Sequence, residues 1–164
     1  MTNNFVFESD LNAKTIHIQR EFHAPVEKVW RAWTEPALLD KWIAPQPWRA
    51  ETKTWDFSTG GIWLYAMIGT DGTKRWVYAQ FTAIDAGSSY STMGMFCDAE
   101  GNPIETAPKS YRVNKFSSLE GNRSMVDTVI TFEDESTIRM FAEGGFKEGT
   151  AMSLANLDEL LAAE

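Results

Sequence analysis

The chain has 164 residues, of which 43% are hydrophobic and 13% aromatic, and its formal net charge is −8 at pH 7. This length is typical of one domain, which can bury roughly two-thirds of its unfolded surface. The acidic balance and the lack of any basic run exclude the positive surface that binding to nucleic acid or to an anionic membrane requires.

The first predicted elements are one strand and two short helices. Residues 14–22 alternate between apolar and polar side chains, as a strand with one covered face does. Pro25 suits the first position of a helix, because the N–H that proline lacks would have no partner there. A second short helix is predicted to begin at Pro36. The preceding residues 1–10 are expected to form a loose tail, and residues 11–164 a single domain.

Further antiparallel strands are predicted after these helices. Turn signals separate them, such as Asp71-Gly72, which supplies the positive φ angles of a tight hairpin. Together with the first strand they would form a sheet of about seven strands. The predicted strands span residues 49–54, 62–68, 75–84, 88–97, 111–119 and 123–132.

The C-terminal part of the chain is predicted to be helical. A short helix over residues 136–142 is interrupted at Gly144-Gly145, and a long helix then runs from Phe146 to the end, with Leu154 and Leu157 on its apolar face. This long helix is the only predicted element that can cover one face of the sheet. The fold class is therefore α+β.

Two segments carry a resemblance to a known family. Residues 20–42, REFHAPVEKVWRAWTEPALLDKW, resemble the opening of START-like (SRPBCC) domains, and are most similar to the heat-shock-protein-90 ATPase activator homologue family. Residues 145–149, followed by LANLDELL at 154–161, are similar to the family's glycine-containing start of a long C-terminal helix. The resemblance implies the helix-grip fold of birch-pollen-allergen-like proteins, and it implies that Gly149 lets this helix approach the sheet.

A curved sheet and a helix laid across it can leave a gap, which we expect to be mainly apolar. Either the strand face with Trp76 and Tyr78 or the opposite face with Val77 and Ala79 could line it, because both faces are apolar. Methionines are a second sign, since a flexible thioether adapts to varied partners. Ordinary core packing would also explain these rings and methionines. The candidate ligand-binding residues are Trp76, Tyr78, Gln80, Met93, Met95, Tyr111, Met140, Phe146 and Met152.

Residues for other chemistry are sparse. The spacing of His17, His23 and Cys97 does not match a zinc site, so we expect neither a metal nor a cofactor. No G-x-S-x-G elbow presents a nucleophile, and we expect no catalytic residue. The single cysteine, the absence of a secretory signal and the absence of a span of ~20 apolar residues favour a cytoplasmic protein.

Three functions remain open. The first is a module that binds a small hydrophobic, lipid-like or aromatic molecule, and it is our prediction. The second, implied by the START-like resemblance, is a polyketide cyclase or aromatase, which needs a polar dyad in the cavity; Tyr78, Gln80, Tyr111, Arg112 and Asp127 are the available residues. The third is a protein-interaction domain that stimulates a chaperone ATPase. An exposed apolar patch around Trp42, Pro45, Pro47 and Trp48 would favour such a protein partner or a homodimer.

Overall fold

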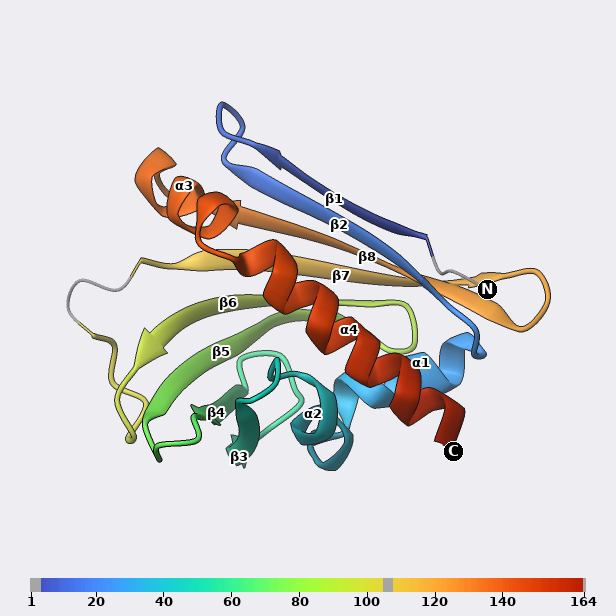
Figure 1. The fold of residues 1–164 in the computed structure, drawn as a ribbon, viewed down its shortest axis with the longest axis horizontal. Helices are drawn as coiled ribbons and strands as arrows, with labels where there is room; N and C mark the ends of the chain where they lie inside the picture. Colours follow the sequence, from blue (N-terminus) through green and yellow to red (C-terminus); the bar gives the residue numbers. More distant parts are fainter. Residues whose placement is uncertain (1–3, 105–107, 164) are drawn as a thin grey trace.

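A curved antiparallel sheet forms the frame of the structure, a computed structural model that describes residues 4–104 and 108–163 (Figure 1). Its described strands follow the order β1-β2-β8-β7-β6-β5-β4-β3, and every neighbouring pair is antiparallel. The elements along the chain are β1 (Phe5–Asp10), β2 (Thr15–Phe22), α1 (Val26–Thr34), α2 (Pro36–Trp42), β3 (Arg49–Trp55), β4 (Ile62–Ile68), β5 (Lys74–Asp85), β6 (Ser89–Cys97), β7 (Ser110–Leu119), β8 (Arg123–Phe132), α3 (Glu135–Glu143) and α4 (Phe146–Ala163).

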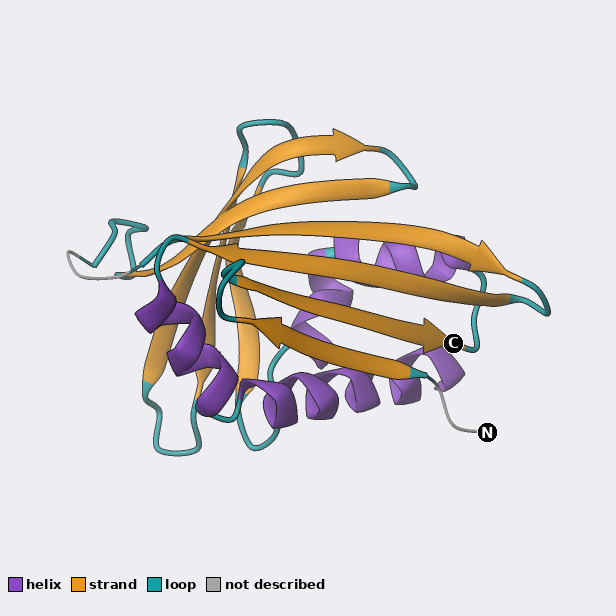
Figure 2. Cartoon of the chain, turned by 90° about the horizontal axis from the view of Figure 1, so that it is seen from above, coloured by secondary structure: helices purple, strands orange, loops and turns teal. Residues whose placement is uncertain are grey.

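The helices lie on one side of this sheet. Figures 1 and 2 show α4 crossing the concave face, with α3 at one end of it and α1 at the other. Helix α4 packs on α1, α2 and α3. This is the helix-grip arrangement, with the curved sheet wrapped around the C-terminal helix. No helix in the described part of the chain is long and apolar enough to cross a bilayer.

The N-terminal segment differs from the expected loose tail. Residues 5–10 form β1, which pairs with β2 from Phe5 opposite Arg20 to Asp10 opposite Thr15, so the described sheet has eight strands. The Phe7 ring also contacts the ring of Phe146 edge-on, with the centroids 5.9 Å apart. A short edge strand is stabilised by such pairing and ring burial, neither of which is visible in six residues of sequence.

The main core fills one end of the molecule, beneath α1 and α2. The Trp30 ring packs edge-on against Phe116, with a centroid separation of 5.0 Å, and against Tyr90 and Phe57 at 6.0 Å each. Leu157 of α4 is fully buried in the same cluster. The large buried rings of the described residues therefore concentrate at this end of the sheet. A second, smaller cluster under α3 consists of Ile16, Ile18, Ile130, Phe132 and Ile138.

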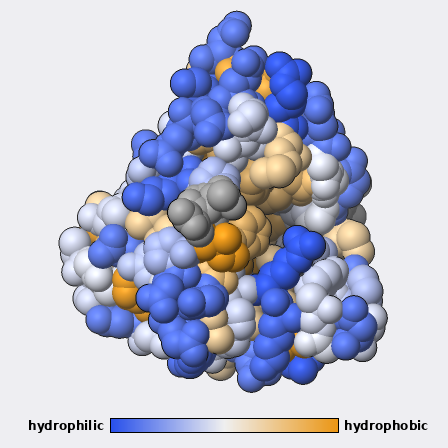
Figure 3. All heavy atoms as spheres, turned by 90° about the vertical axis from the view of Figure 1, so that its left-hand side faces the viewer, coloured by the Kyte–Doolittle hydropathy of each residue, from blue (hydrophilic) through white to orange (hydrophobic). Residues whose placement is uncertain are grey.

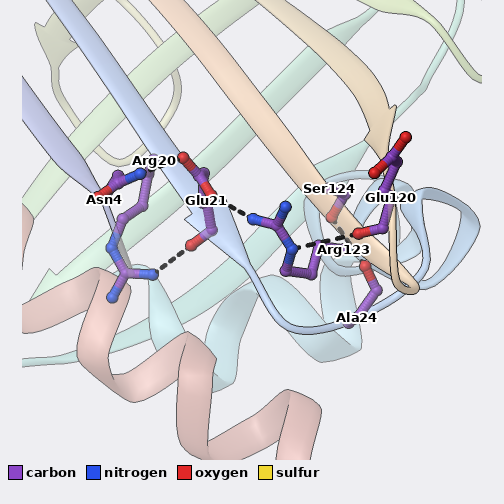
Figure 4. Close-up of polar contacts among 7 residues, drawn as sticks. All are labelled: Asn4, Arg20, Glu21, Ala24, Glu120, Arg123 and Ser124. Carbon is purple, nitrogen blue, oxygen red and sulfur yellow. Dashed lines mark hydrogen bonds and ion pairs between the residues drawn. The ribbon is translucent and has the colours of Figure 1, made fainter. Parts of the chain in front are cut away.

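Polar contacts hold the start of α1 against the sheet. The Ser124 hydroxyl on β8 is buried and donates a hydrogen bond to the Ala24 carbonyl at 2.9 Å. Beside it, the Arg123 guanidinium pairs with the Glu21 carboxylate of β2 at 2.6 Å (Figure 4). Helix α1 carries Trp33 toward the concave face, so these contacts position one wall of the space between sheet and helices.

The family resemblance implied that Gly149 lets α4 approach the sheet, but the structure places Gly149 against a different segment. A Cβ atom built on Gly149 would lie 3.7 Å from Pro45, in the loop that follows α2, in ordinary van der Waals contact. The glycine therefore adjoins the α2–β3 connection. The helix and the sheet remain apart at this level.

Asp134 caps α3, and we expect its replacement to loosen that helix. Its carboxylate accepts hydrogen bonds from the Thr137 hydroxyl at 2.7 Å and from the Thr137 backbone N–H at 2.8 Å. These bonds lower the pKa of Asp134. The cap is therefore complete above the ordinary aspartate pKa of about 4 and is lost as the pH falls through the lower pKa of the folded state.

The measurement is hydrogen–deuterium exchange of residues 135–143, corrected for intrinsic rates. Asp134→Ala should lower protection of these amides at neutral pH, because it removes the acceptor. Asp134→Asn keeps an acceptor but cannot titrate, so its protection should change less on acidification than that of the wild type. Equal protection in the wild type and Asp134→Ala would show that the cap does not hold α3.

Candidate functional site

A cavity lies between the concave face of the sheet and helices α3 and α4. It has two adjoining lobes, of about 300 Å³ and about 490 Å³, which share much of their wall. Residues that border both lobes include Trp33, Tyr65, Phe96, Arg112, Asn114 and Phe146. The cavity opens at the end of the molecule shown in Figure 3, where hydrophobic atoms gather around a hollow. Met140 of α3 borders both lobes and has 58% of its surface exposed.

The sheet contributes to the cavity through alternate residues of its central strands. On β5 these are Val77 and Ala79, whose small side chains leave the space open. On β7 they are Ser110, Arg112 and Asn114. The side chains of β7 that border the cavity are therefore polar, whereas the rest of the cavity wall is mostly apolar.

The structure brings three of the residues predicted for ligand binding to the cavity. Met140 and Phe146 border both lobes, and Met95 borders the smaller one. The remaining predicted residues do not line either lobe: Trp76, Tyr78, Gln80, Met93, Tyr111 and Met152.

These outlying residues lie on the other face of the sheet or on the outer side of α4. The Trp76 ring lies beneath the ammonium groups of Lys53 and Lys74, at 5.5 and 5.9 Å. Met93 pairs directly with Gln80 and with Tyr111, so the three share that outer face, where Tyr111 is 41% exposed. On α4, Met152 is 44% exposed.

Arg112 is the polar centre of the cavity. It borders both lobes, and among the described residues its guanidinium has no hydrogen bond or ion pair with another side chain. Burial lowers the pKa of Arg112, and the nearby Tyr65 and Tyr90 act in the opposite direction. An arginine side chain nevertheless stays protonated in proteins. The cavity therefore holds a positive charge that no described carboxylate of the protein neutralises.

The two tyrosines beside Arg112 remain neutral. Burial raises the pKa of Tyr65 to about 12, although the nearby charge of Arg112 acts to lower it. Burial also raises the pKa of Tyr90. At neutral pH both phenols therefore keep their protons, and each has an O–H that can donate a hydrogen bond.

Asn114 lies one inward position along β7 from Arg112. Its carboxamide oxygen accepts a buried hydrogen bond from the Thr128 hydroxyl of β8 at 2.7 Å. Because the oxygen already accepts this bond, the NH₂ group of Asn114 is the part that can donate a hydrogen bond to a ligand in the cavity. In the register of the sheet, Asn114 faces Tyr90 and Arg112 faces Thr92 of β6, so hydrogen-bonding side chains lie side by side on the two strands.

Two further arginines border the larger lobe, while no Asp or Glu does so among the residues that the structure describes. Arg20 contacts the Asp158 carboxylate of α4 at 2.5 Å and donates to the Glu21 carbonyl at 2.7 Å. Arg75 lies over the ring of Trp48 at 5.7 Å. The described wall is therefore basic, in a protein whose net charge is −8.

The sequence reasoning missed several of these residues. Trp33 and Trp42 were not among the candidate ligand-binding residues, yet both border the cavity. Arg112 was named only as a possible member of a catalytic pair. The sequence of β7 could have indicated these polar residues, because Ser110, Arg112 and Asn114 place polar groups at every second position of a central strand, which is usually apolar on its covered face. The other residue considered for that pair, Asp127, instead accepts a hydrogen bond from Gln19 at 2.8 Å, away from the cavity lining.

No cluster of His, Cys, Asp and Glu in the described part of the chain has the geometry of a metal site. Cys97 is buried, and burial raises the pKa of its thiol, so this sulfur is poorly suited to nucleophilic chemistry at neutral pH.

Comparisons with known proteins identify relatives of this fold. The family model described as Activator of Hsp90 ATPase homolog 1-like protein matches residues 23–162. A solution structure of a protein from Arthrobacter aurescens is 33% identical with a TM-score of 0.89, over 97% of this chain and 92% of that one. Protein Ms6760 from Mycobacterium smegmatis is 29% identical with a TM-score of 0.87, over 99% of both chains. A search among curated proteins found no match.

Proposed function

We propose that this chain, which belongs to the Activator of Hsp90 ATPase homolog 1-like family, binds a small, mainly apolar molecule between its sheet and helices α3 and α4. The observation that carries the proposal is the unfilled space itself. Its lobes of about 300 Å³ and about 490 Å³ are of the size that small-molecule sites have. Its wall is mostly rings and aliphatic groups, with a few polar side chains that can orient a ligand.

Binding is favoured over catalysis by the chemistry of the wall. The described residues that border the two lobes include no Asp, Glu or His. The phenols of Tyr65 and Tyr90 have raised pKa values, so they can donate hydrogen bonds but are poor bases at neutral pH. A cyclase or aromatase would need a group that removes a proton. We therefore propose a receptor or carrier rather than an enzyme of that kind.

The test is a fluorescence titration with N-phenyl-1-naphthylamine, a neutral aromatic probe that emits strongly only in apolar surroundings. We expect saturable enhancement with one probe per chain, and native mass spectrometry should show the same one-to-one adduct. An absence of saturable enhancement would overturn the proposal, because an open apolar cavity of this size should accept the probe.

A further inference from the structure

We propose that the natural occupant of the cavity is an amphipathic anion: a compact aromatic or branched apolar acid whose carboxylate is bound by Arg112. This inference rests on the proposed function, because it names the chemical class of ligand for the same cavity. The structure supports this inference in three parts: the state of Arg112, the donors beside it and the charge of the wall.

The first part is the state of Arg112. Charged side chains are rarely taken out of bulk water without a partner, because an unpaired charge in an apolar site is costly. Arg112 nevertheless borders both lobes without an ion pair to any described carboxylate. Its planar guanidinium matches a carboxylate in a two-bond geometry. A ligand carboxylate would therefore supply a counter-ion that none of the described residues provides.

The second part is the set of groups around Arg112. Thr92 faces it on β6, and Asn114 follows it on β7, with the carboxamide oxygen of Asn114 already bonded to Thr128. The remaining NH₂ group of Asn114 and the neutral hydroxyl groups of Tyr65 and Tyr90 can all donate. A cluster of donors beside a cation suits an anionic acceptor.

The third part is the electrostatics of the wall. Arg20, Arg75 and Arg112 border the larger lobe; Asp158 pairs with Arg20 from outside the lining, and no Asp or Glu is among the described lining residues. The protein as a whole carries a formal charge of −8. Basic groups concentrated in a hollow of an acidic molecule attract anions to that hollow and away from the rest of the surface.

The rest of the lining defines the body of the ligand. Rings from three different elements surround the space near Arg112, namely Trp33 of α1, Phe96 of β6 and Phe141 of α3. Apolar pockets of this kind favour a flat or branched hydrocarbon group over a flexible polar one. The predicted ligand therefore has one acidic group and one compact apolar group.

Isothermal titration calorimetry with 2-naphthoate and 2-naphthamide tests this proposal. The two probes have nearly the same shape and differ in charge. We expect the wild type to bind the carboxylate at least about tenfold more tightly, as a hydrogen-bonded charge pair implies. Arg112→Met should reduce that preference to roughly one, because it keeps the apolar stem and removes the cation. Arg31→Met, which removes an exposed arginine on α1, should keep the preference.

Failure of this proposal differs from failure of the proposed function. If N-phenyl-1-naphthylamine binds the wild type but naphthoate binds no more tightly than naphthamide, the anion proposal is wrong and the apolar cavity remains. If no neutral or charged probe binds, both proposals fall. The wild-type comparison does not depend on any variant, so poor folding of Arg112→Met would leave the test intact. An unchanged preference in a folded Arg112→Met would assign the anion to another residue and overturn the proposal.

Discussion

Gly94→Phe is expected to weaken binding of N-phenyl-1-naphthylamine strongly while leaving the protein folded. Gly94 lies on β6 and borders the smaller lobe. A Cβ atom at this position would meet nothing closer than the Tyr78 carbonyl oxygen at 3.7 Å and the Ser110 hydroxyl at 3.8 Å, both ordinary contacts. Phenylalanine also favours strands. The new ring should therefore occupy the space that the ligand needs.

The matched control is Ser117→Phe, which adds the same ring to an exposed position of β7. We expect it to bind the probe as the wild type does. Fluorescence titration gives the affinities, and circular dichroism at increasing temperature gives the melting temperature of each variant. For Gly94→Phe we expect an affinity for the probe at least about tenfold weaker than that of the wild type, with little change in melting temperature. Wild-type affinity in that variant would place the probe elsewhere.

Trp42→Ala is expected to lower the free energy of unfolding by about 3–5 kcal/mol, the usual cost of removing a large buried ring. Trp42 of α2 is 2% exposed, and its ring centroid lies 4.6 Å from that of Trp33. Its indole N–H donates to the Ala32 carbonyl at 2.9 Å. That carbonyl would meet the N–H of residue 36 in a continuous helix, but Pro36 has none. Trp42 thus closes the end of α1 as well as filling the core.

Trp42→Phe separates these two contributions. It keeps most of the apolar ring but removes the N–H, so we expect a smaller loss of about 1–3 kcal/mol, the cost of a buried acceptor left unpaired. Urea denaturation followed by circular dichroism would give both values. A Trp42→Phe variant as unstable as Trp42→Ala would show that the hydrogen bond dominates, contrary to our expectation.

Local patterns were sufficient for most of the elements. The helix after Pro25 and the strands on either side of Asp71-Gly72 have signals that lie within a few residues, because proline geometry and hairpin turns are set by the chain itself. The strand at residues 5–10 lacked such a signal. It exists because β2 offers a free edge and because Phe7 meets Phe146, a residue distant in the sequence.

The residues of the cavity were much harder to predict. On β5 both faces are apolar, so periodicity could not say whether Trp76 and Tyr78 or Val77 and Ala79 point inward. The structure turns the small residues toward the helices and the large rings toward the other face, where Trp76 lies under Lys53. Only the packing of α3 and α4 over one side distinguishes the two faces.

The amino-acid sequence by itself determined the α+β class, the order of most elements and the family, because these follow from short-range periodicity and from motifs contiguous in the chain. The tertiary structure alone decided that Arg112, Asn114 and Tyr65 meet around one space and that Arg112 has no ion pair with a carboxylate in the part of the chain that the structure describes. Those residues come from strands that pair through long-range contacts. Whether a charge has a partner depends on all the residues that folding brings around it.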